Sequence, residues 1–396
     1  MKIRVFTAFS GYDSQCLALD RLRKTYHSFE YEFVGWAETD KYAINAHNAL
    51  FPECADRNFG DISKIDWENV PDFDLFTYSS PCQDFSIAGL QRGGTEGSGT
   101  RSSLLWECRR AILAKKPKFL LLENVTALVS KKFLPLFNKW LAELDSYGYA
   151  NYASVLDAKN YGVPQHRPRI FVVSIRGENN RYHFPQPFQL ERKLKDVLEK
   201  EVDEKFYLSD TVVKVFEDKV MVIQKGEEKP DFISRGCQND SYNRVLKPDG
   251  YCGSRNCTKE VEILEPMIKQ VGNIVEEKGF SNPQRGRVYD IEGISPAICT
   301  MTSGGTEPKI LIPKPTKQYE CYYRIRKLTP RECFRLMGVN DADIDRIQAH
   351  IANGKPISSS QQYKMAGNSI VVDVLFHIFR KMFVEIERES RQLELF

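Results

Sequence analysis

The strongest constraint on the fold is an alternation of short β-rich runs with helical patterns between residue 3 and about residue 175. The β-rich runs include IRVFTAF at 3–9, YEFVGWAE at 31–38 and PKFLLLEN at 117–124, and segments with apolar residues at helical spacing separate them. Strands that alternate with helices of about 10 to 15 residues favour a mostly parallel sheet with both faces covered. The pattern therefore predicts an α/β fold built on a doubly wound, mostly parallel sheet.

The alternation stops after YHFPQPFQ at 182–189, and short strand-like pieces, charges and turns follow. A regular pattern returns at RKLTPRECFRLMGV, 326–339, where Thr329 is placed to cap a helix. The apolar helical pattern at 368–389 predicts a last helix that packs back onto the first part of the chain. We therefore expect a first domain over 1–186, a smaller, irregular β-rich domain over 187–322, and a return to the first domain over 323–396.

Composition narrows the class of protein without giving its function. The 396 residues are 42% hydrophobic, and no apolar run approaches the roughly 18 residues of a membrane span. The N-terminus lacks the charged and then apolar pattern of a signal peptide, so we expect a cytosolic protein that contacts no membrane. The net charge of +3 neither favours nor excludes a nucleic-acid partner.

The ten cysteines contain no CxxC pair. Cys237, Cys252 and Cys257 come closest to a metal cluster, but no second close pair and no group of histidines accompanies them. We therefore expect reduced thiols and no bound metal.

Polar residues follow the predicted strands where those strands end. An open α/β sheet binds its ligands outside the carboxyl ends of its strands, so these residues are the candidates for chemistry. They are Ser10 and Gly11 after the first strand, Glu38 after the second, Ser79 to Cys82 after the next, and Glu123 with Asn124 after FLLL.

Cys82 follows an apolar strand and precedes a loop, which is where a nucleophilic thiolate gains partial exposure and a polar neighbourhood. The alternative is a packed, inert thiol. Residues 89–101 contain five glycines in thirteen positions, too many for a packed element. This segment suits a loop that closes over a ligand, although a plain surface loop has the same composition.

Glu123 ends an all-apolar strand, and burial there would raise the pKa of its carboxyl toward neutral pH. The same acid could instead be an N-cap partner at the start of a helix. Arg167 and Arg169 lie two residues apart as the chain enters a strand, so they could hold a carboxylate, a phosphate or a carbonyl oxygen. His166 has no acid or cysteine near it in sequence, and we interpret it as structural.

Taken in this order, the motifs resemble those of the cytosine-C5 DNA methyltransferases of bacteria and phages, which move a methyl group from S-adenosyl-L-methionine to carbon 5 of cytosine. The resemblance covers nearly the whole chain. It implies the Rossmann-like α/β fold of class I methyltransferases, with residues 187–322 as a target recognition domain. The matching motifs are FTAFSG at 6–11, ETDKYA at 38–43, GDI at 60–62, PCQ at 81–83, ENV at 123–125, QHRPR at 165–169, RKLTPRECFRLMG at 326–338 and GNS at 367–369.

The resemblance implies a role for each catalytic candidate. Cys82 would attack carbon 6 of the ring, which makes carbon 5 nucleophilic enough to take the methyl group. Glu123 would hold the base at N3 and the exocyclic amine and would protonate N3. Arg169 would donate to the O2 carbonyl, and Arg167 would support Glu123 or the surroundings of the nucleophile.

The resemblance also implies a site for S-adenosyl-L-methionine. Phe9 would lie against the cofactor, and Glu38 would accept from the ribose hydroxyls. Thr39 stands where many relatives have a tryptophan. The full set of implied cofactor-binding residues is Phe9, Gly11, Glu38, Thr39, Asp61, Ile62, Pro81, Leu104, Asn368 and Ser369.

The turn FSGYDSQ carries a single glycine, and Tyr12, Asp13 and Ser14 replace small residues that are common in the family's turn. A methyltransferase cofactor has no pyrophosphate, so one close backbone approach at Gly11 suffices. We expect these three residues to reshape the rim of the methionine end of the site without abolishing binding.

The DNA substrate must present a cytosine swung out of the duplex, because the target carbon is unreachable inside the stack. The resemblance gives Ser86 and Arg101 contacts to the phosphates of the flipped nucleotide. It places Gln284, Arg285 and Arg287 on the loop that enters the DNA, where arginine and glutamine suit reading of base edges. A turn that contacts only phosphate remains the alternative for each of these three residues.

Two other functions stay open from the sequence. The first is a tRNA cytosine-C5 methyltransferase built on the same catalytic domain, and the second is a catalytically silent DNA-binding relative. The expected partner is double-stranded DNA. The enzyme would act as a monomer, either beside a cognate restriction endonuclease or as an orphan methylase.

Overall fold

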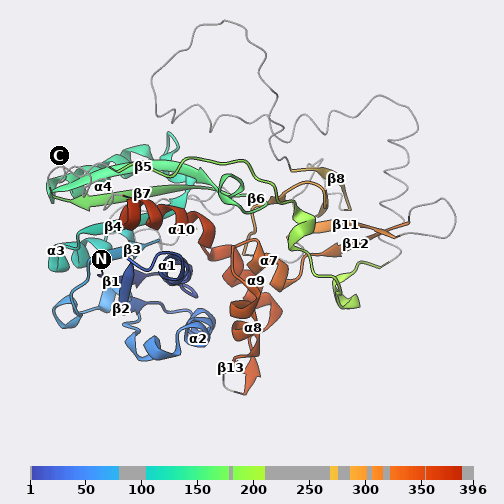
Figure 1. Ribbon diagram of the computed structural model, residues 1–396, viewed down its shortest axis with the longest axis horizontal. Helices are drawn as coiled ribbons and strands as arrows, with labels where there is room; N and C mark the ends of the chain where they lie inside the picture. The colour runs from blue at the N-terminus through green and yellow to red at the C-terminus, as the bar shows by residue number, and fades with distance from the viewer. Residues whose placement is uncertain are drawn as a thin grey trace, which may run out of the picture.

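The computed structural model describes residues 2–79, 104–177, 182–209, 268–274, 286–300, 306–314, 322–352 and 354–385. A six-stranded sheet with helices on both faces makes up the larger body, and a four-stranded sheet makes up a smaller one (Figure 1). Among the described residues, no helix is both long and apolar enough to cross a membrane.

The large sheet has the strand order β2-β1-β3-β4-β7-β5. Strands β2, β1, β3 and β4 are parallel, whereas β7 is antiparallel to both of its neighbours, β4 and β5. The α/β class predicted from the alternation is confirmed, with one reversed strand in an otherwise parallel sheet. The strands are β1 (Lys2–Ala8), β2 (Glu30–Ala37), β3 (Leu75–Tyr78), β4 (Phe119–Val125), β5 (Tyr149–Asp157) and β7 (Pro168–Arg176).

Two apolar cores lie on opposite faces of this sheet, because successive side chains of a strand point to opposite sides. In β1, Ile3 and Val5 belong to one core and Phe6 and Ala8 to the other. Helices α1 (Ser14–Thr25) and α10 (Val372–Arg380) cover the first core, and α3 (Cys108–Lys115) and α4 (Leu134–Ser146) cover the second. The predicted return of the last helix onto the first domain is confirmed by the packing of α10 against α1.

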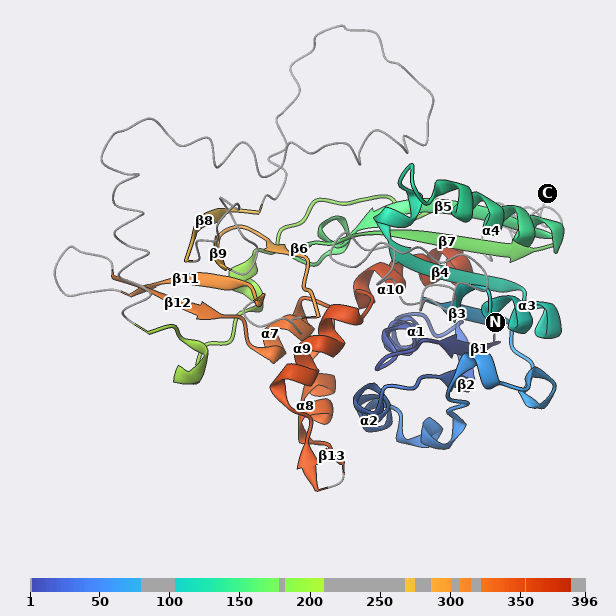
Figure 2. The same cartoon turned by 180° about the vertical axis from the view of Figure 1, so that it is seen from behind.

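The smaller sheet has the order β12-β11-β9-β8 and lies beside the large body, as the view from behind also shows (Figure 2). Its strands are β8 (Gln270–Asn273), β9 (Arg287–Asp290), β11 (Lys309–Lys314) and β12 (Tyr322–Lys327). A short parallel pairing of β6 (Gln165–His166) with β10 (Ser295–Pro296) connects this part of the chain to the large body. Strand β12 spans the expected boundary between 322 and 323, and the three-part division of the chain stays a prediction.

The remaining helices complete the large body and the link to the smaller sheet. Thr329 caps α7 through a capping box with Glu332, as its sequence position predicts. Helix α7 ends at Arg335, before Gly338, which has a φ of +77°. The remaining helices are α2 (Lys41–Leu50), α7 (Pro330–Arg335), α8 (Asp341–Ala349) and α9 (Ser359–Asn368). A short antiparallel pair, β13 (Ile351–Ala352) and β14 (Lys355–Pro356), lies between α8 and α9.

Short helical turns join these elements. They are Pro52–Arg57, Ile62–Lys64, Trp67–Asn69, Thr126–Val129, Ala158–Tyr161, Leu194–Val197 and Glu204–Phe206, and a π-helical turn, Lys381–Glu385, follows α10.

Candidate active site and cofactor site

The turn after β1 has an unusual backbone. Phe9, Gly11 and Asp13 all have left-handed backbone angles, with φ of 55°, 59° and 68°. Two of the three are not glycine, and such conformations persist only where surrounding contacts hold them. Asp13 is the N-cap of α1: its carboxylate accepts from the Cys16 N–H at 3.1 Å and from Thr7 Oγ1 at 2.7 Å.

Glu38 lies at the end of β2 and is fixed by the chain around it. Its Oε2 accepts from the Gly11 N–H at 2.9 Å, and its Oε1 accepts from the N–H groups of Thr39 and Asp40 at 2.7 and 2.8 Å. Asn58 bonds both backbone groups of Glu38, with its Oδ1 accepting at 3.2 Å and its Nδ2 donating at 3.1 Å. The carboxylate is therefore held beside the turn, with oxygen lone pairs left to accept from a ligand.

The other predicted cofactor residues gather around this point. Asp61 caps a short helical turn and accepts from Ser63, and these bonds hold the pKa of Asp61 below its usual value. Ile62 belongs to the same apolar cluster against which Phe9 and Leu104 pack. Thr39 and Asn368 are exposed, and Ser369 is half-buried at the end of α9.

Glu123 and Arg169 face each other across the antiparallel pair β4 and β7. Arg169 Nε lies 3.3 Å from Glu123 Oε1, and the Ser79 side chain also hydrogen-bonds to Glu123. Burial raises the pKa of Glu123, while Arg169, Arg167 and the bond from Ser79 oppose that shift. Since Ser79 directly follows β3 and lies three residues before Cys82 in the sequence, Glu123 stands next to the strand end that leads to the predicted nucleophile.

Arg167 is buried and has different partners from Arg169. Its guanidinium donates to the carbonyl oxygens of Ile298 at 2.7 Å and of Gly367 and Ser369, both at 2.8 Å. It thus joins three segments that lie far apart in the chain, and its charge also acts on Glu123. His166 Nδ1 lies 2.5 Å from Asp157, so it has an acidic partner that the sequence did not indicate.

Several predicted residues lie outside the described part of the chain, and their placement stays a prediction. Arg287 is described: it begins β9, and its side chain hydrogen-bonds to that of Tyr289. The residues outside the described ranges are Pro81, Cys82, Ser86, Arg101, Gln284 and Arg285.

The expectation that Tyr12, Asp13 and Ser14 reshape the rim of the methionine end without abolishing binding stays a prediction, and their side chains are buried, at 1%, 0% and 3% exposed. The left-handed backbone at Asp13 turns its carboxylate inward to Thr7. Tyr12 and Ser14 instead both contact the hydroxyl of Ser369, 2.5 and 2.6 Å away. The sequence carried no signal for these contacts.

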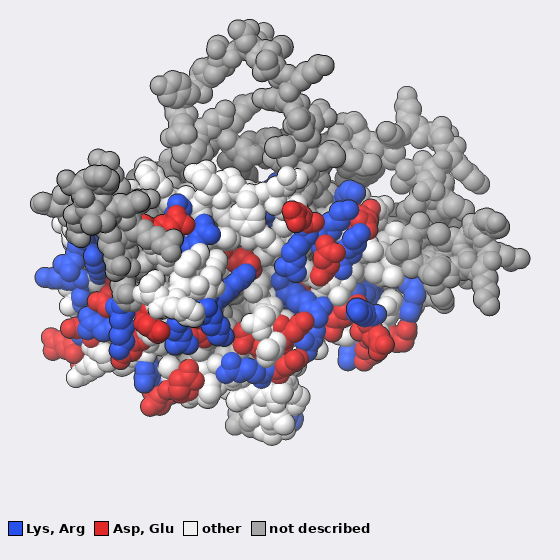
Figure 3. All heavy atoms as spheres, viewed as in Figure 1, with Lys and Arg blue, Asp and Glu red and all other residues white. Residues whose placement is uncertain are grey.

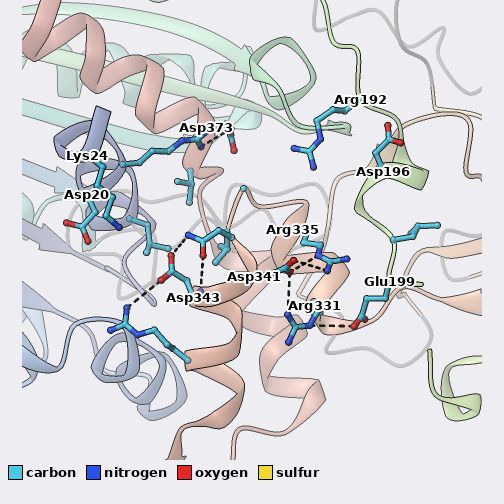
Figure 4. Close-up of a pocket in the computed structure, with 18 of the residues that line it drawn as sticks. Asp20, Lys24, Arg192, Asp196, Glu199, Arg331, Arg335, Asp341, Asp343 and Asp373 are labelled. Carbon is cyan, nitrogen blue, oxygen red and sulfur yellow. Dashed lines mark hydrogen bonds and ion pairs between the residues drawn. The ribbon is translucent and has the colours of Figure 1, made fainter. Parts of the chain in front are cut away.

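An open cavity of 1290 Å³ lies elsewhere, between α1, α7, α8 and residues 192–201 (Figure 4). Among the residues that line it, Arg335 pairs with Asp341, Arg331 pairs with Glu199 and Arg21 pairs with Asp373. None of the predicted site residues that the structure describes lines this cavity.

Surface charge does not single out a DNA-binding face on the side of the molecule drawn in Figure 3. Basic and acidic side chains alternate over the described part of that face. This agrees with the near-neutral net charge of +3.

Comparison with known proteins decides the family. A family model described as C-5 cytosine-specific DNA methylase matches residues 3–384. The chain belongs to this family. It is 32% identical to the type II methyltransferase M2.ScrFI of Lactococcus lactis subsp. cremoris, over 96% of this chain and 99% of that protein. It is 28% identical to the orphan methyltransferase M.SPRI of Bacillus phage SPR, over 98% of this chain and 99% of that protein.

A solved structure, that of the Entamoeba histolytica methyltransferase EhMeth, has the same fold, with a TM-score of 0.63 at 14% identity and coverage of 98% of this chain and 99% of that one. The methylase is thus a DNA (cytosine-5-)-methyltransferase that uses S-adenosyl-L-methionine and acts on DNA. The comparisons do not support a tRNA substrate better than a DNA substrate.

The described residues fit the cofactor that this methylase uses. A Cβ built on Gly11 meets none of the described atoms within 4 Å, so the described part of the chain leaves space open at the turn there. The hydroxyl of Ser10 in the same turn is buried, and within the described structure it has no hydrogen-bond partner. With the fixed carboxylate of Glu38, these groups suit a ligand that carries hydroxyl donors and a positive charge.

Proposed function

We propose that the methylase transfers the methyl group through a covalent adduct between Cys82 and carbon 6 of a cytosine flipped out of a specific duplex sequence. The observation that carries this proposal is the buried Glu123 carboxyl at the end of β4, paired with Arg169 and bonded by Ser79. A carboxyl whose pKa is raised by burial can hold a proton near neutral pH, which is what protonation of the ring N3 requires.

The proposed steps conserve atoms and charge. The thiolate of Cys82 adds to carbon 6 while Glu123 gives a proton to N3 and Arg169 donates to the O2 carbonyl. Carbon 5 would then take the methyl group that bound S-adenosyl-L-methionine supplies, and S-adenosyl-L-homocysteine would leave with the electron pair of the broken sulfur–methyl bond. A water or hydroxide removes the proton from carbon 5, the bond from sulfur to carbon 6 breaks, and N3 returns its proton to Glu123.

The cofactor site in this proposal is formed by the turn after β1, Glu38 and the end of α9. Glu38 would accept from the ribose hydroxyls, and Phe9 would pack against the adenine or the methionine portion. Asp61 and Ile62 would meet the adenine, and Leu104 and Pro81 would line the pocket. Asn368 and Ser369 would close the methionine end. Arg167 supports the proposal through its bonds to Gly367 and Ser369, which fix that end of α9.

Covalent trapping tests the mechanism. Duplex DNA with 5-fluorocytosine at the target position should form a stable complex with the full chain and S-adenosyl-L-methionine, because fluorine cannot leave as the proton does. Cys82→Ala should lose the complex, whereas Cys299→Ala, which removes a partly exposed thiol, should keep it. A complex that survives Cys82→Ala, or none with the unaltered chain, would refute the mechanism.

We further propose that the methylase works as a monomer in the cytosol, either with a restriction endonuclease of the same specificity or as an orphan. The relatives support both roles, since one is named a type II and another an orphan methyltransferase. Methylation mapping of DNA from cells that express the protein tests the specific-sequence claim, which fails if the modified base is adenine or N4-methylcytosine. Endonuclease challenge of the same DNA identifies a partner enzyme, and size-exclusion chromatography tests the monomer.

A further inference from the structure

Three hydroxyl groups connect the turn after β1 to the end of α9. Ser369 Oγ donates to the Tyr12 hydroxyl oxygen at 2.5 Å and lies 2.6 Å from Ser14 Oγ. Tyr12 and Ser14 are 1% and 3% exposed, so water does not compete for these bonds. The ring of Tyr12 also packs edge-on against Phe334 of α7, at 5.5 Å between ring centroids.

The backbone around Ser369 is held from its other side. Arg167 donates to the carbonyl oxygens of both Gly367 and Ser369. The exposed residue between them, Asn368, is therefore fixed by a guanidinium on one side and by the hydroxyl contacts on the other. Neither set of contacts alone fixes the distance from Asn368 to the turn.

The turn itself needs such support. Its left-handed residues Phe9, Gly11 and Asp13 alternate with Ser10 and Tyr12, and strained backbone relaxes when the contacts that hold it are removed. Asp13 is held by Thr7 and Cys16, but its neighbour Tyr12 is tied to the rest of the molecule through Ser369 and Phe334.

We propose that Tyr12 and Ser14 are positioning residues for the cofactor, and that they act by tying Ser369 and Asn368 to the turn that carries Phe9 and Gly11. This inference rests on the cofactor site of the proposed function. In this proposal, the side chains of Tyr12 and Ser14 act through Ser369. They set the separation of the two segments between which its methionine end binds.

The test is Tyr12→Phe in the full chain, which removes one hydroxyl and keeps the ring against Phe334. The matched control is Tyr149→Phe: Tyr149 is 2% exposed, and its hydroxyl donates to the Pro117 carbonyl at 2.6 Å on the far side of the sheet. Both variants lose one buried hydrogen bond, so both should lower the melting temperature of the cofactor-free protein by a similar amount.

Only Tyr12→Phe should weaken binding of S-adenosyl-L-methionine, by about 3- to 10-fold in calorimetry without DNA, since one neutral hydrogen bond contributes roughly that factor. Its KM for the cofactor should rise by the same factor while kcat changes less than about twofold, because the reacting groups are untouched. An affinity for the cofactor that matches that of Tyr149→Phe would overturn the inference.

Two further variants separate this inference from the proposed cofactor site. Ser14→Ala tests the same contact from α1 and should weaken cofactor binding in the same direction. The double variant Tyr12→Phe with Ser369→Ala should bind S-adenosyl-L-methionine no more weakly than the single variant of the two that has the lower affinity. Additive losses of affinity would overturn the inference. If Glu38→Gln binds the cofactor as tightly as the unaltered chain, the proposed site itself is wrong. If Glu38→Gln loses binding while Tyr12→Phe does not, only the positioning role fails.

Discussion

The ion pair between Arg326 on β12 and Glu332 on α7 allows a sharp prediction about stability. The two side chains are 2% and 0% exposed, and two parallel bonds of 2.8 and 2.7 Å join them. The Glu332 carboxylate also accepts from the backbone N–H groups of Thr329 and Glu199, both at 2.8 Å. All four bonds need an acceptor oxygen, and the pair connects the smaller sheet to the large body.

Glu332→Gln replaces one of these oxygens by an NH₂ group and leaves the guanidinium of Arg326 buried without a charge partner. Removing one partner of a buried pair costs about 3 to 5 kcal/mol, and we expect a loss of unfolding free energy in that range. The control is Glu204→Gln in the pair with Arg324, whose side chains are 75% and 37% exposed. That change should cost about 0.2 to 1 kcal/mol.

Urea denaturation followed by tryptophan fluorescence measures both losses, with the slope of the transition compared between variants. Arg326→Met and the double variant complete a cycle in which the double variant should lose much less than the sum of the singles. If Glu332→Gln costs no more than Glu204→Gln, the buried pair does not stabilise the junction and the reasoning is refuted.

Two other changes test the packing of the large body. Burial raises the pKa of Asp13 to about 6 and lowers the pKa values of His47 and His377 to about 4. As pH falls from 6.5 to 4, protonation of Asp13 therefore favours the folded state, whereas protonation of the two histidines favours the unfolded state. Asp13→Asn should make stability fall more steeply with falling pH than in the unaltered chain, and an unchanged slope would contradict the shift of Asp13. Gly367→Ala places a Cβ 2.2 Å from the Cys299 carbonyl oxygen and should cost about 3 kcal/mol or more of unfolding free energy. In its control, Gly148→Ala, the Cβ meets no described atom within 4 Å, and the loss should be about 1 to 2 kcal/mol, for its left-handed backbone; equal losses would show that Gly367 is not a contact point.

The large sheet was predictable because its signals are local. The β-rich runs at 3–9 and 117–124 correspond to β1 and β4 within one or two residues, and Thr329 caps α7 as its sequence position predicts. Helix α7 is shorter than its pattern, because the chain turns toward Gly338 and a helical period alone does not register that turn.

Contacts within the candidate site could be predicted only where the two residues lie at the ends of neighbouring strands. Glu123 and Arg169 come together because β4 and β7 are neighbours, and Glu38 meets Gly11 because β1 and β2 are neighbours. The contact of Tyr12 with Ser369 depends on how the last helices dock, which no local pattern encodes. That is why the sequence alone did not indicate the partner of Tyr12.

The contact between Tyr12 and Ser369 also sets an order of events during synthesis. The two residues are 357 positions apart, so the ribosome must add 357 residues after Tyr12 before they can meet. N-terminal segments generally fold first as they emerge. The first strand, turn and helix of this protein must nevertheless wait for Ser369 to be translated before they reach their final form.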